Sequence, residues 1–130
     1  MPLEYSIDHD RQIVFVRAIG DLTEIDFYTY QETVWVRSTI QHYSELIDMT
    51  AVGNIIAPSA IAIKDLADTA ARTDPIAPAE RKVAIVVHDD RTYGLGRMYE
   101  QFRTNSSNNR TAVSVFREFA AARAWLNCPE

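Results

Sequence analysis

Residues 82–88, with the sequence KVAIVVH, form the most restrictive pattern in this chain. Five apolar residues in succession, Val83 to Val87, leave no polar side that could face solvent. A short apolar run of this kind is typical of a strand covered on both faces, as in the middle of a parallel sheet. Parallel neighbours need crossover connections, which are usually helices. The run therefore predicts an α/β domain.

The rest of the chain repeats a strand-then-helix rhythm around this strand. Thr23 and Asp26 form a capping-box-like start for the first helix, and Pro75 and Pro78 break the chain after the second. The order ββαβαβαβα predicts one domain over residues 1–130, with an antiparallel opening hairpin and right-handed crossovers in a five-stranded, mostly parallel mixed sheet with four helices. We predict strands at 3–7, 12–19, 45–49, 82–88 and 111–116, and helices at 24–38, 59–72, 91–103 and 118–126.

The composition limits the partners of the chain. With 130 residues and a net charge of -5, it lacks the positive surplus for general electrostatic binding to nucleic acid or to an anionic membrane surface. The N-terminal sequence MPLEYSIDHD has neither a basic nor an apolar segment, so we predict no signal peptide and a cytoplasmic protein. Cys128 is the single cysteine, which excludes an intrachain disulfide and a cysteine-based metal site.

The sequence shows no recognisable catalytic motif, because a nucleophile elbow, a Walker motif and a Ser/His/Asp order are all missing. Asp89 and Asp90 are adjacent and point in different directions, which makes them a poor acid–base pair. His9, His42 and His88 are scattered, and no pair of them has the spacing of metal ligands. We therefore predict a protein that is not an enzyme and that binds no metal and no cofactor.

Polar residues gather where the predicted parallel strands end and the helices begin. Open parallel sheets bind ligands beyond the carboxyl ends of their strands, so this edge is the candidate binding site. Some of these residues also have a structural explanation, with Ser59 and Asp90 as helix N-caps, Asp48 as an acceptor for loop amides and His88 as a structural residue. The candidate ligand-binding residues are Asp48, Thr50, Ser59, His88, Tyr93, Arg97 and Tyr99.

The third predicted helix combines weak local stability with an apolar side. Gly94 and Gly96 each weaken it by roughly 1 kcal/mol relative to Ala, or they let it approach the sheet closely. Met98 and Phe102 either line an apolar pocket under this helix or belong to the core. We therefore predict that this helix acts as a lid over such a pocket, since weakly stable segments open locally at low cost.

The first predicted helix carries more large apolar residues than one buried stripe uses. Either these residues fill a thick core, or part of them faces a partner subunit, an apolar ligand or a lipid surface. Tyr28 and Trp35 are the candidate interface residues, and the apolar surplus predicts a homodimer.

Several short motifs, in this order and spacing, resemble one family. The segment 46–52 (LIDMTAV) resembles the strand and loop of STAS domains. The motifs VAIVV (83–87), YGLGRMY (93–99), VFR (115–117) and AWL (124–126) resemble a bacterial SpoIIAA-like family of small proteins, which is also likened to CRAL-TRIO lipid-binding domains. The resemblance covers residues 3–126 and implies a SpoIIAA-like (STAS) fold.

The resemblance implies two kinds of function. One is a non-catalytic module that binds a small amphiphile or a lipid and associates with membranes at their periphery. The other is a regulatory module that binds a partner protein or a second copy of the chain. Phosphorylated STAS antagonists carry Asp-Ser-Ser-Gly before the helix, and an ungapped comparison from Asp48 places the phosphoacceptor at Ala57. Because alanine has no hydroxyl, we expect no phosphorylation switch at this loop.

Overall fold

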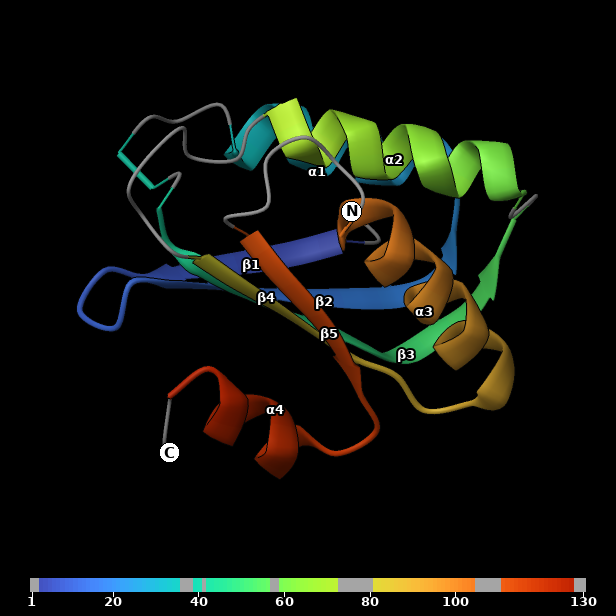
Figure 1. Cartoon of the computed structure of the whole chain (residues 1–130). Coiled ribbons are helices and arrows are strands. Elements are labelled where there is room, and N and C mark those ends of the chain that lie inside the picture. The colour runs from blue at the N-terminus through green and yellow to red at the C-terminus, as the bar shows by residue number, and fades with distance from the viewer. Residues whose placement is uncertain are drawn as a thin grey trace.

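The computed structural model describes residues 3–35, 39–40, 42–56, 59–72, 81–104 and 111–127. Its strands form one five-stranded sheet in the order β1-β2-β3-β4-β5, in which β1 is antiparallel to β2 and the other neighbours are parallel. The elements are β1 (Leu3–Asp8), β2 (Ile13–Leu22), α1 (Glu24–Val34), β3 (Ser44–Ile55), α2 (Ala60–Arg72), β4 (Arg81–Val86), α3 (Asp90–Thr104), β5 (Thr111–Phe116) and α4 (Phe119–Trp125). This arrangement confirms the predicted α/β class, the mixed sheet and the order ββαβαβαβα (Figure 1).

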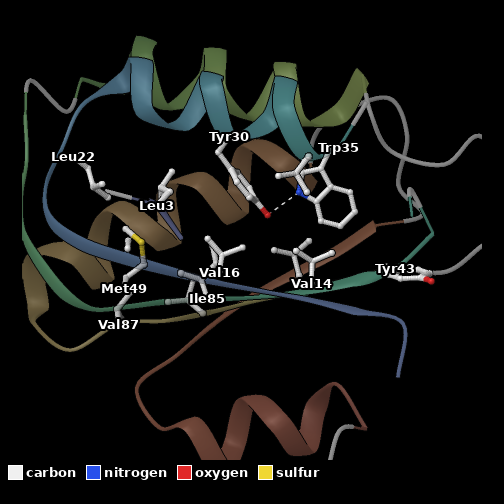
Figure 2. Packing of buried hydrophobic residues seen from close by; sticks show 14 of the residues in the cluster. Leu3, Val14, Val16, Leu22, Tyr30, Trp35, Tyr43, Met49, Ile85 and Val87 are labelled. Atoms are coloured by element: carbon white, nitrogen blue, oxygen red, sulfur yellow. Dashed lines mark hydrogen bonds between the residues drawn. The ribbon is translucent and has the colours of Figure 1, made fainter. Parts of the chain in front are cut away.

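Helices α1, α2 and α3 lie on one face of the sheet, and α4 lies on the other (Figure 1). The alternation of side chains along each strand divides the core between the two faces. Val14 and Val16 of β2 enter the larger core under α1, α2 and α3 (Figure 2), whereas Ile13 packs toward α4. In β4, Ile85 belongs to the larger core and Ala84 to the smaller one. Both faces of β4 are therefore covered, as its continuous apolar run predicts.

Strand β3 is longer than the predicted strand at 45–49, because its second half continues to pair with β2 through two register shifts. Gly53 lies in this second half, close to Asp21 of β2. A Cβ atom at Gly53 would stand 2.7 Å from Asp21 Oδ1, and the same oxygen accepts a hydrogen bond from the backbone N–H of Asn54 at 3.0 Å. A larger residue at position 53 would push the Asp21 side chain out of the position in which its Oδ1 accepts from Asn54, so glycine favours this contact between β2 and β3.

Helix α1 begins with the predicted capping box. Asp26 N donates to Thr23 Oγ1 at 3.4 Å, and Thr23 N donates to Asp26 Oδ2 at 2.8 Å. The helix ends at Val34, whereas the sequence predicts an end at Ser38, and residues 36–38 lie outside the described part of the chain. None of the helices that the structure describes has the length and apolar character needed to cross a membrane.

The N-cap of α3 is Asp89, so the prediction of Asp90 in this role is wrong. Asp89 Oδ1 accepts a hydrogen bond from the backbone N–H of Thr92 at 2.7 Å, and this bond lowers the pKa of the Asp89 carboxyl. The Asp90 carboxylate is instead exposed and pairs with Arg117 Nη2 at 2.6 Å. The residue before the first helical residue has extended backbone angles that aim its side chain at the free amide groups.

Replacing Asp89 by alanine should lower the free energy of unfolding by about 1 kcal/mol, because the Thr92 amide loses its acceptor. Asp90→Ala is the matched control and should cost at most about 0.5 kcal/mol, since it removes an exposed ion pair. Urea unfolding at neutral pH measures both values. Because the pKa of Asp89 is lowered in the folded chain, its contribution should be present above about pH 4 and be lost as pH falls further. Equal costs for the two variants would contradict the assignment.

Candidate functional site

An apolar cavity of about 100 Å³ lies between the sheet and the layer of α1, α2 and α3. Native cores rarely contain voids larger than a water molecule, so a space of this size is unusual in a small domain. Apolar cavities of comparable size stay dry and bind small apolar molecules. The cavity is lined by Leu3, Val16, Glu24, Phe27, Tyr30, Gln31, Ile47, Met49, Ile55, Ile56, Ala62, Ile63, Leu66, Ile85, Val87, Thr92, Leu95, Gly96 and Tyr99.

The cavity opens at the carboxyl end of the parallel strands. Ile56 directly follows β3, lines the cavity and is 52% exposed, so it lies at the opening. Glu24 and Ala62, in the first turns of α1 and α2, also line it. The neighbours of these two residues in sequence, Ile25 and Ile61, are 72% and 75% exposed. Three exposed isoleucines therefore lie at this end of the fold, with Ile56 at the opening itself, and we call Ile25, Ile56 and Ile61 the isoleucine rim.

Of the predicted ligand-binding residues, all of which the structure describes, Tyr99 is the one that lines this cavity. Asp48 lies on the opposite face of the sheet, because it follows Leu46 at the two-residue spacing of one strand face. There Asp48 Oδ2 stands 4.0 Å from Arg17 Nε, and Asp48 Oδ1 accepts hydrogen bonds from the N–H and the hydroxyl of Thr50. Asp48 and Thr50 are thus separated by the sheet from the cavity.

Asp48 and Arg17 instead line a second hollow of about 370 Å³ on the α4 side of the sheet. This hollow is more open than the apolar cavity, and Glu4 and Arg123 also line it. Its charged residues include the Arg17–Asp48 pair, so it is an open hollow with charged groups rather than an enclosed apolar space. We therefore take the apolar cavity as the candidate site.

The other predicted residues surround the same end of the fold without lining the cavity. Ser59 caps α2, because its Oγ accepts from the Ala62 N–H at 3.1 Å, which confirms the structural alternative for Ser59. His88 is exposed. The Tyr93 ring packs against the core and lies 4.5 Å from the Arg117 guanidinium. The exposed Arg97 pairs through Nη1 with Oε2 of the buried Glu100 at 3.0 Å.

The two glycines of α3 differ in their surroundings. A Cβ atom at Gly96 would stand 3.3 Å from both methyl carbons of Val115, whereas one at Gly94 would meet nothing within 4 Å. Gly96 therefore lets α3 approach β5 closely, as one of the two sequence interpretations requires. Met98 and Phe102 are not among the residues that line the cavity. Opening of α3 as a lid stays a prediction.

The candidate interface residues of α1 have different environments. Trp35 is 1% exposed and belongs to the core, so its prediction as an interface residue is wrong. Tyr28 is half-buried beside α2, where partial burial and the carboxylates of Glu24 and Asp65 raise the pKa of its hydroxyl. Much of the apolar surplus of α1 thus enters a thick core. A homodimer built on Tyr28 stays a prediction.

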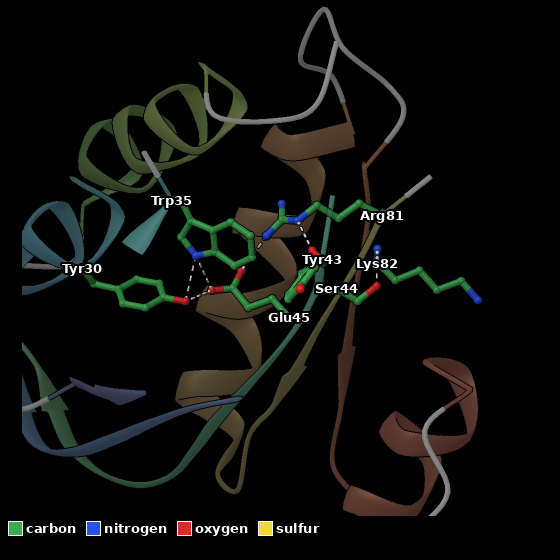
Figure 3. Close-up of polar contacts among 7 residues, drawn as sticks. All are labelled: Tyr30, Trp35, Tyr43, Ser44, Glu45, Arg81 and Lys82. Atoms are coloured by element: carbon green, nitrogen blue, oxygen red, sulfur yellow. Dashed lines mark hydrogen bonds and ion pairs between the residues drawn. The ribbon is translucent and has the colours of Figure 1, made fainter. Parts of the chain in front are cut away.

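Tyr30, which lines the cavity, also belongs to a buried polar cluster that no motif in the sequence indicates (Figure 3). Glu45 Oε2 accepts hydrogen bonds from the Tyr30 hydroxyl and from Trp35 Nε1, and Glu45 Oε1 accepts one from Arg81 Nη2 at 3.2 Å. Arg81 Nε donates to the backbone oxygen of Tyr43 at 2.7 Å, and its guanidinium lies 4.0 Å from the centre of the Trp35 ring. Glu45 and Arg81 are 2% and 4% exposed, so their opposite charges compensate each other inside the core.

This cluster should make the free energy of unfolding depend on pH in the alkaline range. Burial and the adjacent Glu45 carboxylate raise the pKa of Tyr30 well above its ordinary value. Above about pH 10 the unfolded chain releases the Tyr30 proton while the folded chain retains it. The contribution of Tyr30 to the free energy of unfolding should therefore fall by about 1.4 kcal/mol per pH unit. The difference in free energy of unfolding between wild type and Tyr30→Phe should therefore be constant near pH 8 and shrink above about pH 10. A difference that does not change with pH would contradict this result.

The residues 57 and 58 lie outside the described part of the chain, so the structure does not place Ala57, where the resemblance puts the phosphoacceptor. The described residues contain no group of three or more His, Cys, Asp or Glu side chains that is arranged to hold a metal ion.

No protein-family model and no curated protein matches the chain. Among solved structures, it is similar to an uncharacterized protein of the DUF3478 family with a SpoIIAA-like fold from Shewanella loihica PV-4. The two chains share 16% sequence identity at a TM-score of 0.58, over 95% of this chain and 91% of the other. At this identity the likeness is one of fold, and it confirms the SpoIIAA-like fold that the sequence motifs predict.

Proposed function

We propose that this SpoIIAA-like domain is a non-catalytic binding module that holds a small apolar or amphiphilic molecule in the cavity under α1, α2 and α3. The observation that carries the proposal is the apolar cavity of about 100 Å³. An empty cavity destabilises a fold in proportion to its volume, and a bound molecule restores the missing contacts. The cost of the cavity is therefore offset when a molecule occupies it.

The position of the opening supports an amphiphile. The isoleucine rim offers apolar surface at this end of the fold, with Ile56 at the entrance and Ile25 and Ile61 exposed on the first turns of α1 and α2. A ligand that enters here moves from apolar surface into an apolar cavity, and burial of its apolar area stabilises the complex by about 25 cal/mol per Å². A polar head group remains at the opening, in contact with water.

Blocking the cavity tests the proposal. Ala62 lines the opening and is partly exposed, so Ala62→Leu should fill the entrance with little cost in stability. Ala71, also partly exposed on α2 and not a lining residue, gives the matched control Ala71→Leu. We expect 1-hexanol to shift the methyl resonances of Ile63, Leu66 and Ile85 saturably in wild type and in Ala71→Leu, with at least a roughly tenfold weaker affinity in Ala62→Leu.

Native mass spectrometry of freshly purified protein complements the titration, because it detects a molecule that is already bound. The absence of saturable binding in wild type would overturn the proposal. Equal affinity in Ala62→Leu and Ala71→Leu would overturn the placement of the ligand in this cavity.

A further inference from the structure

We infer that the molecule held in the cavity carries a neutral hydrogen-bond donor, such as a hydroxyl group, which Gln31 Oε1 accepts. The inference rests on the proposed function and specifies the chemistry of the ligand. Gln31 lies on α1 and lines the apolar cavity. Its Oε1 is buried and accepts no hydrogen bond from any residue that the structure describes. A buried acceptor without a donor is unfavourable, so Gln31 marks a point where a ligand donor stabilises the complex.

The nearby polar groups either have another partner or lie at the opening of the cavity. The Tyr30 hydroxyl, the adjacent polar group on α1, donates to Glu45. Glu24 and Thr92 lie in the first turns of α1 and α3, at the open end of the cavity. Gln31 is seven residues further along α1 than Glu24, and a helix rises about 10 Å over that distance. Gln31 Oε1 is thus a buried acceptor that lies further along α1 than the polar groups at the opening.

The surroundings of Gln31 favour a ligand, rather than an ordered water molecule, as the donor to its Oε1. A buried water molecule holds its position through two to four polar partners, and the lining around Gln31 is mainly aliphatic and aromatic. A charged donor such as an ammonium group would lose its hydration in this apolar space, which a neutral hydroxyl avoids at much lower cost. The geometry therefore favours an apolar body with a hydroxyl, or an amide N–H, that reaches Gln31.

An isomeric pair of probes isolates the donor. 1-Hexanol and methyl pentyl ether contain the same atoms, but the alcohol donates a hydrogen bond and the ether only accepts one. We compare the ratio of their affinities in wild type, in Gln31→Leu and in the matched control Gln101→Leu, which makes the same substitution at an exposed position of α3. Since each ratio is compared across variants, the different solubilities of the two probes cancel.

We expect the alcohol-to-ether affinity ratio to be about three- to tenfold higher in wild type and in Gln101→Leu than in Gln31→Leu. Gln31→Met, which keeps the length of the side chain, should behave like Gln31→Leu. Both Gln31 variants should be at least as stable as wild type in the absence of probe, because they remove an unpaired buried acceptor. Thermal unfolding therefore verifies that they fold.

The possible results separate this inference from the proposed function. Binding of both probes with one affinity ratio in all variants would overturn the role of Gln31 and leave the cavity as the binding site. A lower ratio in Gln101→Leu as well would also overturn it, because the effect would not be local. If neither probe binds wild type, the proposed function itself fails, and the inference fails with it.

Discussion

Replacing Arg81 by methionine should lower the free energy of unfolding by about 3 to 5 kcal/mol. The substitution keeps a long apolar side chain over the Trp35 ring but removes the cation that pairs with Glu45 at 3.2 Å. The Glu45 carboxylate would then remain buried with the hydroxyl of Tyr30 and the indole N–H of Trp35 as donors and without an opposite charge. Chemical unfolding, measured by the fluorescence of the tryptophans, gives the value.

Arg117→Met is the control for this result. It removes the same kind of side chain from a pair with Asp90 in which both partners are exposed, and it should cost about 1 kcal/mol or less. Adding Glu45→Gln to Arg81→Met should recover part of the loss, because the amide oxygen still accepts hydrogen bonds while the uncompensated charge disappears. Similar costs for Arg81→Met and Arg117→Met would show that the buried pair does not stabilise the fold.

Leu66→Ala should lower the free energy of unfolding by about 2 to 5 kcal/mol and enlarge the cavity. Leu66 is 8% exposed and lines the cavity from α2. The removed methyl groups leave additional apolar space, so the variant should bind small apolar probes such as benzene more tightly than wild type does. At a benzene concentration of 100 times its dissociation constant, binding should restore about 2.7 kcal/mol of the loss.

Leu126→Ala provides a matched comparison on the other face of the sheet. Leu126 is also 8% exposed, but it belongs to the smaller core near α4 and does not line the cavity. The two variants should lose similar amounts of stability in the absence of probe. Benzene should stabilise Leu66→Ala more strongly than Leu126→Ala, because only Leu66→Ala enlarges the cavity under α1, α2 and α3. Equal rescue of both variants would mean that the space left by Leu66 does not bind the probe.

The sequence predicts the elements well because their signals are local. The apolar run at 82–88 needs two covered faces, and the structure supplies them with α1 to α3 on one side and α4 on the other. The start of α1 follows from the spacing of Thr23 and Asp26. The end of β3 was missed because its second half, with Gly53 and Asn54, has a weak strand pattern and pairs with β2 through register shifts. Such pairing depends on a partner strand that is distant in sequence.

The sequence predicts the candidate site less well. A position near the end of a strand does not determine on which face of the sheet the side chain lies. Asp48 alternates with Ile47 and Met49, both of the larger core, so its position on the opposite face follows from the period of two. The same alternation places Glu45 on the face of Ile47, which is the signal for a buried carboxylate. Gln31 carries no comparable signal, since its role depends on the cavity that three helices form with the sheet.

The strand order has a consequence for how the chain reaches this structure. Every strand pairs with its neighbours in sequence, so each step of sheet growth closes one connection, a tight turn between β1 and β2 and a helix-containing crossover at each later step. Pairing strands that are further apart in sequence would close longer loops at a larger cost in chain entropy, and this strand order avoids that additional cost. The hairpin of β1 and β2 has no need of later residues for its pairing, and β3, β4 and β5 then join one edge in turn. A domain of this topology can be assembled from one end to the other, in the order in which a ribosome delivers it.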